Sequence, residues 1–308
     1  MISPRYRAQV DLLLQIIPHV AKEECFALKG GTAINMFIWN MPRLSVDIDL
    51  TYLPFTGRAE ALVAIAEALQ RTKQRIEIAI PACRARISSQ GSGHEAKLTC
   101  QMPGAQIKIE VNTITRGHLF VPQEMEVLDI VESKFGRFVS MRVVSPAELF
   151  GGKICAALDR QHPRDLFDVH QLFARGGLTS EIRQGFLASL LSSNRPIHEI
   201  LQPHFLDQRS AFEMQFSGMT EEPFSYLDFE SARERLIREL HATLTDAERD
   251  FLLSFTEGEP DWELFAYEKV RYLPAVQWKL SNIRTLKSRN QAKYHAQLKS
   301  LKELLQLG

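Results

Sequence analysis

The sequence predicts an α/β (α+β) fold, in which a small mixed sheet with helices on one side is followed by a mainly α-helical C-terminal domain. Up to about residue 140, stretches with helical periodicity alternate with stretches in which every second side chain is apolar. From Ser145 the pattern is helical nearly to the end of the 308 residues. That length suits two domains of ordinary size. We therefore expect a first domain over residues 1–140 and a helical domain over 141–308.

The alternating part of the chain is expected to form strands connected by helices and loops. Helices are expected at 11–17, 33–38 and 59–69. Strands are expected at 25–28, 45–50, 75–80, 85–87, 96–101 and 105–112. The Ser- and Gly-rich stretch 88–93 is expected to be a loop between two of these strands.

The composition is that of an ordinary globular protein, with 45% hydrophobic and 24% charged residues. Its 37 basic and 37 acidic residues give a formal net charge of zero, which favours no class of partner. The cysteines lack metal-ligand spacing and lie in apolar stretches, so we expect reduced thiols. They are Cys25, Cys83, Cys100 and Cys155. No export signal and no apolar run long enough for a bilayer is visible, so a cytoplasmic protein is expected.

A glycine turn near the start of the chain predicts a phosphate-binding loop. Gly30-Gly31-Thr32 follows an expected strand and leads into the apolar stretch 33–38, which is the pattern of strand, turn and helix. Backbone N–H groups at such a turn, and at the start of the following helix, have no internal partner and can bind phosphate. A Gly-Gly pair taken alone is usually only a turn.

Two aspartates shortly after this turn predict a metal site. Asp47 and Asp49, together with Ser45, point to the face opposite the apolar side chains of the expected strand 45–50. Residues two apart in a strand have Cα atoms roughly 7 Å apart, so both carboxylates can reach one divalent ion. Mg²⁺ commonly bridges one or two carboxylates to substrate phosphates. The two motifs together indicate a nucleoside triphosphate (NTP) held with magnesium.

A third carboxylate is predicted at Glu110, which lies opposite the buried side chains Ile107, Ile109 and Val111 of its expected strand. An ordinary amphipathic strand with a surface glutamate explains the same pattern, and a bare Asp-x-Asp is more often a solvated strand face. The glycine turn next to Asp47 and Asp49 favours the metal site. Glu110 would then be a metal ligand, or the base that accepts a proton from an attacking hydroxyl.

The helical half supplies a second group of candidates. Lys153 and Arg160 lie two turns apart on one face of a helix that starts after Ser145, so both cations could approach a polyphosphate. Asp165 and Asp168 share a face of the next expected helix, 164–173. A helical hairpin with surface ion pairs is the simpler alternative.

Taken together, the motifs resemble the AbiEii/AbiGii toxin family of nucleotidyltransferases. The resemblance is carried by Lys29-Gly30-Gly31-Thr32, by Ser45-Val46-Asp47-Ile48-Asp49, and by Lys-x-x-Ala-x-x-x-Arg-x-x-x-Arg-Asp-x-Phe-Asp from Lys153 to Asp168. The segment 273–283 also resembles the C-terminal segment of the family. The resemblance implies a nucleotidyltransferase-fold sheet and an enzyme that moves a nucleotide from an NTP to an acceptor. From the organisation of the chain we expect the active site in a cleft between the two domains.

Roles follow from the resemblance by position. The glycine turn would hold the triphosphate, Asp47 and Asp49 would bind Mg²⁺, and Lys153 would contact phosphate. Asp165 and Asp168 would orient Lys153, bind the nucleoside or assist the acceptor. The assignment of Glu110 rests on the strand pattern instead. The expected nucleotide-binding residues are Gly30, Gly31, Thr32, Ser45, Lys153 and Arg160.

The resemblance also implies a biological role. MenT-like members of the family add nucleotides to the acceptor end of tRNA and so stop translation. The expected protein is thus a toxin of a bacterial toxin–antitoxin or phage-defence system, with an NTP, the tRNA acceptor end and a cognate antitoxin as partners, and without membrane contact. A nucleotidyltransferase acting on an antibiotic or a protein is the alternative. A non-catalytic binding module is disfavoured by the three carboxylates and Lys153.

Cations crowd the last stretch of the chain, at Lys279, Arg284, Lys287, Arg289, Lys293, Lys299 and Lys302. Apolar residues recur there at steps of three and four, at Tyr294, Leu298, Leu301 and Leu305, which predicts a helix with one packed and one basic exposed face. The exposed face would contact RNA phosphates or be merely solvated.

Overall fold

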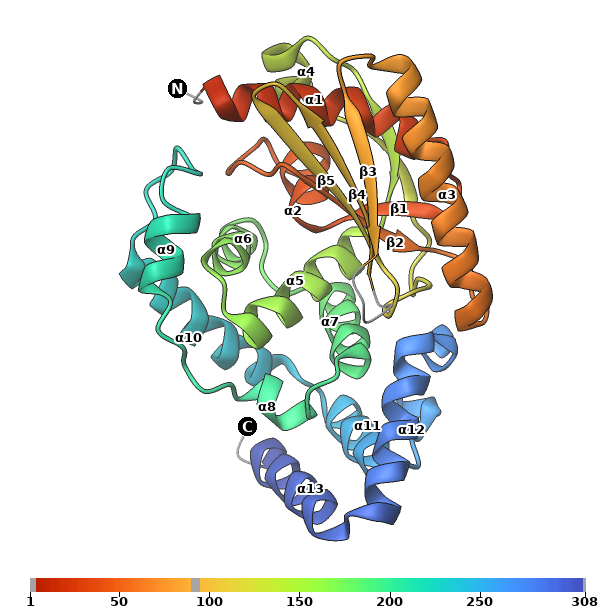
Figure 1. Ribbon diagram of the computed structural model, residues 1–308. Helices are drawn as coiled ribbons and strands as arrows, with labels where there is room; N and C mark the ends of the chain where they lie inside the picture. The colour runs from red at the N-terminus through yellow and green to blue at the C-terminus, as the bar shows by residue number, and fades with distance from the viewer. Residues whose placement is uncertain (1–3, 90–94, 307–308) are drawn as a thin grey trace. The chain divides into compact units, whose positions relative to one another are not determined.

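The computed structural model describes residues 4–89 and 95–306, and the chain divides into two compact units, Met1–Ser145 and Pro146–Gly308 (Figure 1). The first unit holds a seven-stranded mixed sheet with helices, and the second is built of helices. The predicted fold class is confirmed. Most of the loop expected at 88–93 lies outside the described residues.

The first unit contains all the strands. They are β1 (Phe26–Lys29), β2 (Asp47–Tyr52), β3 (Arg84–Ser89), β4 (Glu95–Met102), β5 (Ala105–Asn112), β6 (Gln123–Glu126) and β7 (Ser140–Val143). Its helices are α1 (Pro4–Ala21), α2 (Gly30–Ala33), which continues into the π-helical turn η1 (Ile34–Ile38), α3 (Arg58–Ala79) and α4 (Asp129–Phe135).

The sheet has the strand order β3-β4-β5-β2-β1-β7-β6. β2 runs parallel to β5 and antiparallel to β1, and it lies near the middle of the sheet. In this register Asp47 is the partner of Lys108, and Asp49 is the partner of Glu110. The parallel pairing of β2 and β5 therefore places the three predicted acids on neighbouring strands.

One face of the sheet forms the core of the first unit. Ile48, Leu50, Ile107 and Ile109 are all fully buried, as strict alternation in β2 and β5 requires. α1 packs against β5, and α3 packs against β3 and β4 (Figure 1). The residues between these apolar positions point to the opposite face, where the acids are.

The strand expected at 75–80 is wrong. Those residues are the last turns of α3, which runs from Arg58 to Ala79. Isoleucines at every second position there mimic a strand, but Leu69, Thr72 and Ile76 are buried at helical spacing along the continuous helix. The short strands β6 and β7 and helix α4 were not anticipated.

The second unit is built of helices connected by loops. Its helices are α5 (Pro146–Arg160), α6 (Pro163–Ala174), α7 (Ser180–Ser192), α8 (Ile197–Leu201), α9 (Arg209–Gln215), α10 (Tyr226–Thr243), α11 (Asp246–Glu257), α12 (Pro274–Arg289) and α13 (Gln291–Gln306), with the 3₁₀ turns η2 (Trp262–Leu264) and η3 (Glu268–Tyr272).

Two glycines let α5 and α7 pack backbone against backbone. A Cβ atom on Gly151 would lie 2.2 Å from the carbonyl carbon of Gly185, and one on Gly185 would lie 2.2 Å from the carbonyl oxygen of Ala147. No side chain fits either position. This contact fixes the helix that carries Lys153.

The four cysteines are free thiols, and all except the half-buried Cys25 are buried. Burial raises the pKa of Cys155 to about 12. Within 4–89 and 95–306, none of the helices combines the length and the apolar character that a membrane span requires.

Candidate functional site

The glycine turn lies directly against the strand that carries the two aspartates. Lys29, the last residue of β1, is the register partner of Asp49, and α2 begins at the next residue. Gly30 has a φ of +74°, and a Cβ atom there would lie 2.3 Å from Oδ2 of Asp49. Glycine is required at this position both for its backbone conformation and for the approach of the carboxylate.

The third residue of the turn ties it to β2. The hydroxyl of Thr32 donates a hydrogen bond to the backbone carbonyl of Asp47 at 2.5 Å, and it lies 3.0 Å from the hydroxyl of Ser45. Thr32 and Ser45 are both buried. Their side chains therefore connect the turn to the acidic strand. Because both hydroxyls are engaged in this way, the backbone N–H groups of the turn are better candidates for phosphate binding than the hydroxyls are.

The sequence pattern did not identify two residues that contact this turn, Asn35 in η1 and Arg43 in the segment between η1 and β2. The side-chain amide of Asn35 donates to the carbonyl of Gly31 at 2.8 Å, and its oxygen accepts from the backbone N–H of Arg43. The buried guanidinium of Arg43 comes so close that a Cβ atom on Gly31 would lie 2.7 Å from its Nη2. An arginine between two apolar stretches, just before the acidic strand, was the available signal.

Asp47 and Asp49 are both half-buried on one face of β2. Glu110 lies beside Asp49 in the register, but its Oε1 atom is 3.0 Å from Nζ of Lys97 on β4. The described residues hold no group of three or more His, Cys, Asp or Glu side chains gathered for a metal ion. The aspartates are thus brought together as expected, whereas Glu110 is engaged in an ion pair that the sequence pattern did not reveal.

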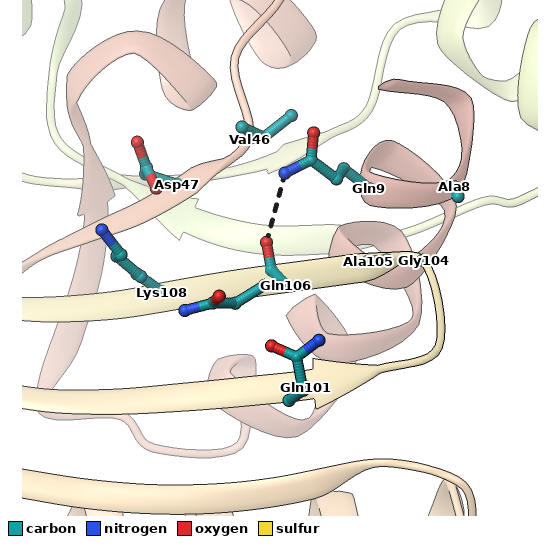
Figure 2. A pocket seen from close by; sticks show the side chains of 9 residues that line it. All are labelled: Ala8, Gln9, Val46, Asp47, Gln101, Gly104, Ala105, Gln106 and Lys108. Atoms are coloured by element: carbon teal, nitrogen blue, oxygen red, sulfur yellow. Dashed lines mark hydrogen bonds between the residues drawn. The ribbon is translucent and has the colours of Figure 1, made fainter. Parts of the chain in front are cut away.

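A recess of about 740 Å³ opens beside Asp47, at the end of the sheet where β4 turns into β5 (Figure 2). Its polar lining comes from Gln9, Asp47, Gln101, Gln106 and Lys108, and its remaining lining from Ala8, Val46, Gly104 and Ala105. The amide of Gln9 on α1 donates to the carbonyl of Gln106 at 3.4 Å and so connects that helix to β5.

In the second unit, the predicted lysine and acids form one buried cluster. Nζ of Lys153 lies 2.8 Å from Oδ1 of Asp165 and 3.1 Å from Oδ2 of Asp168. Arg160 donates to both oxygens of Asp165, at 2.5 and 3.0 Å. Lys153 and the two acids are at most 8% exposed, whereas Arg160 is 64% exposed. Two carboxylates therefore fix the lysine, and Arg160 connects the cluster to solvent.

The charges around Asp165 determine its protonation. Burial raises its pKa, but the charges of Lys153 and Arg160 and their hydrogen bonds outweigh burial and hold the pKa well below the usual range. The carboxylate is therefore ionised at neutral pH. The start of α6 supports this arrangement, because His162 accepts a hydrogen bond from the backbone N–H of Arg164 and Pro163 occupies the first turn.

The predicted site residues fall into two groups. Gly30, Gly31, Thr32, Ser45, Asp47, Asp49 and Glu110 belong to the first unit, and Lys153, Arg160, Asp165 and Asp168 to the second. A cleft shared by the two domains stays a prediction.

The expectation of an exposed basic tail is wrong for Lys279. This lysine is 7% exposed, and its ammonium donates to the carbonyls of Leu190 and Arg195, both at 2.8 Å. Burial lowers its pKa to about 8. Local sequence pattern could not reveal these carbonyls, because they lie in the last turn of α7 and just after it, more than eighty residues before Lys279.

Several other tail cations bind the end of α11. Arg284 and Lys287 donate to the carbonyls of Gly258 and Glu257, and Lys302 lies 2.9 Å from the carboxylate of Glu257. Tyr294, Leu301 and Leu305 are buried, as the apolar spacing predicted. Much of the basic charge of α12 and α13 therefore stabilises the helical unit itself.

Comparisons with known proteins agree with this architecture. MenT4, a nucleotidyltransferase toxin from Mycobacterium tuberculosis H37Rv, has a similar solved structure with a TM-score of 0.61 at 16% sequence identity, over 90% of this chain and 92% of that chain. At that identity the similarity shows the fold. A search of curated proteins gives no significant match.

The family comparison reaches further, because a family model covers residues 11–282. That family is described as nucleotidyl transferase AbiEii toxin, type IV TA system, and its range includes both groups of candidate residues. The chain belongs to the AbiEii toxin family of nucleotidyltransferases.

Proposed function

We propose that this nucleotidyltransferase toxin transfers a nucleotide from an NTP to the 3′ end of tRNA, with Asp47 and Asp49 as the catalytic carboxylates, and that a cognate antitoxin neutralises it. The observation that carries the proposal is the position of Asp49, whose Oδ2 lies where only a glycine at position 30 leaves room. A substrate phosphate bound by the N–H groups of the turn would come to lie next to this carboxylate.

The residues present fit a divalent metal ion. Asp47 and Asp49 offer half-buried carboxylate oxygens from one strand face, which is the donor type that Mg²⁺ prefers. Mg²⁺ usually keeps waters and substrate phosphates as its other ligands, so two protein carboxylates suffice. When bound, the ion would neutralise phosphate charge and make the acceptor hydroxyl more acidic. We propose Glu110 as a third ligand only in a state in which it has left Lys97.

The reaction is an in-line displacement at the α-phosphorus. The oxygen of the acceptor hydroxyl forms a bond to the α-phosphorus, the bond from that phosphorus to the bridging oxygen breaks, and pyrophosphate leaves. The hydroxyl proton passes to a carboxylate, for which Glu110 is the candidate. The glycine turn orients the triphosphate next to Asp47 and Asp49, which act as carboxylates.

Lys153 and Arg160 are proposed to stabilise phosphate charge. An ammonium has three N–H donors, and Asp165 and Asp168 use two of those of Lys153, which leaves one for a phosphate oxygen. Arg160 is the more accessible cation of the cluster. Asp165 and Asp168 act as positioning residues, because they fix the lysine and do not themselves face solvent.

The acceptor can be tested directly. The purified protein is incubated with each α-labelled NTP and total RNA in the presence of Mg²⁺, and RNA is then separated from protein. We expect label in RNA of tRNA size and loss of the reaction with a chelator. Label on the protein fraction, or on an aminoglycoside added in place of RNA, would instead assign one of the alternative acceptors.

The close approach at Gly30 gives a separate prediction. Gly30→Ala is expected to lower the transfer rate by about 100-fold or more, because the new Cβ atom displaces the Asp49 carboxylate. Gly136→Ala is the matched control, since Gly136 also has a positive φ, of +66°, but has nothing within 4 Å of the added atom. Both variants carry backbone strain of about 1–3 kcal/mol, so thermal melting should rank them close together. Equal transfer rates would refute the steric role of Gly30.

A further inference from the structure

The sheet face that carries the two aspartates extends over three more strands. On β3, β4 and β5 the residues between the apolar positions are mostly polar or cationic, and most are exposed in the described chain. The exposed residues are Arg84, Arg86, Ser88, Gln101, Gln106 and Lys108, with Lys97 and Thr99 half-buried among them. α1 and α3 cover the opposite, apolar face. We call these eight residues the polar sheet face.

The register arranges the polar sheet face into rows that run across the strands. One row consists of Arg86, Thr99, Lys108 and Asp47, because each is the Cα partner of the next. A second row consists of Arg84, Gln101 and Gln106. Neighbouring strands are about 4.8 Å apart, so the first row spans roughly 14 Å from Arg86 to Asp47. Both rows thus lead towards the reactive end of β2.

The cations of these rows are available to a ligand. Arg84, Arg86 and Lys108 are exposed, and within residues 4–89 and 95–306 no carboxylate forms an ion pair with any of them. Lys97, by contrast, is paired with Glu110. Three cations without an ion pair to any described carboxylate lie on one face of the sheet, next to two carboxylates proposed to act on a phosphate substrate, and they form a surface that is complementary to a polyanion.

The recess beside Asp47 is lined by residues of both rows, namely Lys108 and Asp47 of the first and Gln101 and Gln106 of the second (Figure 2). Its lining includes the carboxamides of Gln101 and Gln106. Gln101 donates one N–H to the carbonyl of Met102 at 3.0 Å, and its second N–H and its oxygen, like the carboxamide of Gln106, are a donor and an acceptor in one plane, as the edge of a nucleobase is. Its volume of about 740 Å³ leaves room for a nucleoside.

We propose that the polar sheet face binds the acceptor RNA strand, with its phosphates on Arg84, Arg86 and Lys108 and its terminal nucleoside in the recess beside Asp47. This inference rests on the proposed function and identifies the surface that presents the acceptor. RNA is favoured over an acidic protein because the polar lining of the recess consists of three carboxamides, one cation and the Asp47 carboxylate, and its largest apolar side chain, Val46, is too small to anchor a protein.

The test measures RNA binding in the absence of NTP, so that it does not depend on catalysis. Labelled total tRNA and a labelled short single-stranded RNA are titrated with the wild type and with the double variant Arg84→Glu/Arg86→Glu, at several salt concentrations. We expect at least about tenfold weaker binding, and a salt dependence whose slope falls by roughly 1.4, which is 0.7 for each lost contact with a single strand.

The matched control is Lys22→Glu/Lys134→Glu, which changes the net charge by the same amount at two exposed positions, one directly after α1 and one in α4. Its RNA affinity should stay within twofold of the wild type. A second control, Arg289→Glu/Lys293→Glu, changes exposed cations of the C-terminal helices and is expected to have little effect.

Three outcomes would overturn the assignment, and a fourth would separate it from the proposed function. Wild-type protein that binds neither RNA, or a double variant that binds as the wild type does, removes the polar sheet face as an RNA site. Unchanged RNA binding together with lost neutralisation by the antitoxin would assign the face to an acidic protein. If the variant binds RNA weakly while the wild type labels only a small molecule or a protein, the surface assignment stands and the proposed acceptor fails.

Discussion

Asp49→Asn is expected to lower nucleotide transfer by about 10³-fold or more, since the carboxylate charge beside the glycine turn is lost while the side chain keeps its shape. Asp47→Asn should have a comparable effect, because both carboxylates lie on the same face of β2. Both residues are half-buried, so the exchange of oxygen for nitrogen should leave the fold intact. Transfer rates with saturating NTP and RNA measure the effect, and circular dichroism and thermal melting check the fold.

Two further measurements separate the role of the aspartates from that of Glu110. If Glu110 serves only as the partner of Lys97, the variant Glu110→Gln should transfer nucleotides almost as fast as the wild type. If Glu110 is instead the catalytic base or a metal ligand, the same variant should transfer much more slowly. Retention of wild-type transfer by either Asp47→Asn or Asp49→Asn would refute the assignment of the carboxylates. Toxicity of the same variants in growing cells should follow their transfer rates.

Lys153→Met is expected to destabilise the second unit by about 3–5 kcal/mol, because it leaves Asp165 and Asp168 buried without their common cation. Unfolding in urea, monitored by the tryptophan fluorescence of the protein, measures the change in the free energy of unfolding. Lys302→Met is the matched control, since it breaks the half-exposed ion pair with Glu257 and should cost at most about 1 kcal/mol. Equal losses for the two variants would show that the buried cluster does not hold the fold together.

The same cluster predicts a dependence on pH. The pKa of Asp165 is lower in the folded protein than in the unfolded chain, so the unfolded chain binds more protons in acid. Its contribution to the free energy of unfolding is complete above the usual value of about 3.9 and is lost as the pH falls below it. In Lys153→Met the pKa of Asp165 rises, so acid unfolding should begin at higher pH. An unchanged acid transition would contradict the role of Lys153.

The sequence predicted what depends on local periodicity. Alternation of apolar and polar residues in 105–112 predicted β5 with its observed ends. Alternation in the predicted strand 45–50 placed Asp47 and Asp49 on one face of β2. It failed at 75–80, because isoleucines two apart occur both in a strand and at the end of an amphipathic helix. The continuous burial of Leu69, Thr72 and Ile76 along α3 decided for the helix.

Contacts between distant residues were beyond local pattern. Lys97 forms its ion pair with Glu110 because β4 and β5 are a hairpin whose register makes these two residues partners. Arg43 lies at the glycine turn because the side chain of Asn35 accepts a hydrogen bond from the backbone N–H of Arg43. Lys279 has the pattern of a surface charge, but its ammonium donates to the carbonyls of Leu190 and Arg195, which lie 89 and 84 residues earlier in the chain. In each case tertiary packing, and not residue type, determines the role of the charge.

Labelling of tRNA with and without an intact 3′ end tests the central claim most directly. Periodate destroys the terminal 2′,3′-diol, so treated and untreated tRNA are compared as acceptors of α-labelled NTP with the wild type and with Asp49→Asn. The account predicts label at the 3′ end of untreated tRNA only, and transfer slower by about 10³-fold or more with Asp49→Asn. Equal labelling of periodate-treated tRNA, or transfer by Asp49→Asn at the wild-type rate, would contradict it.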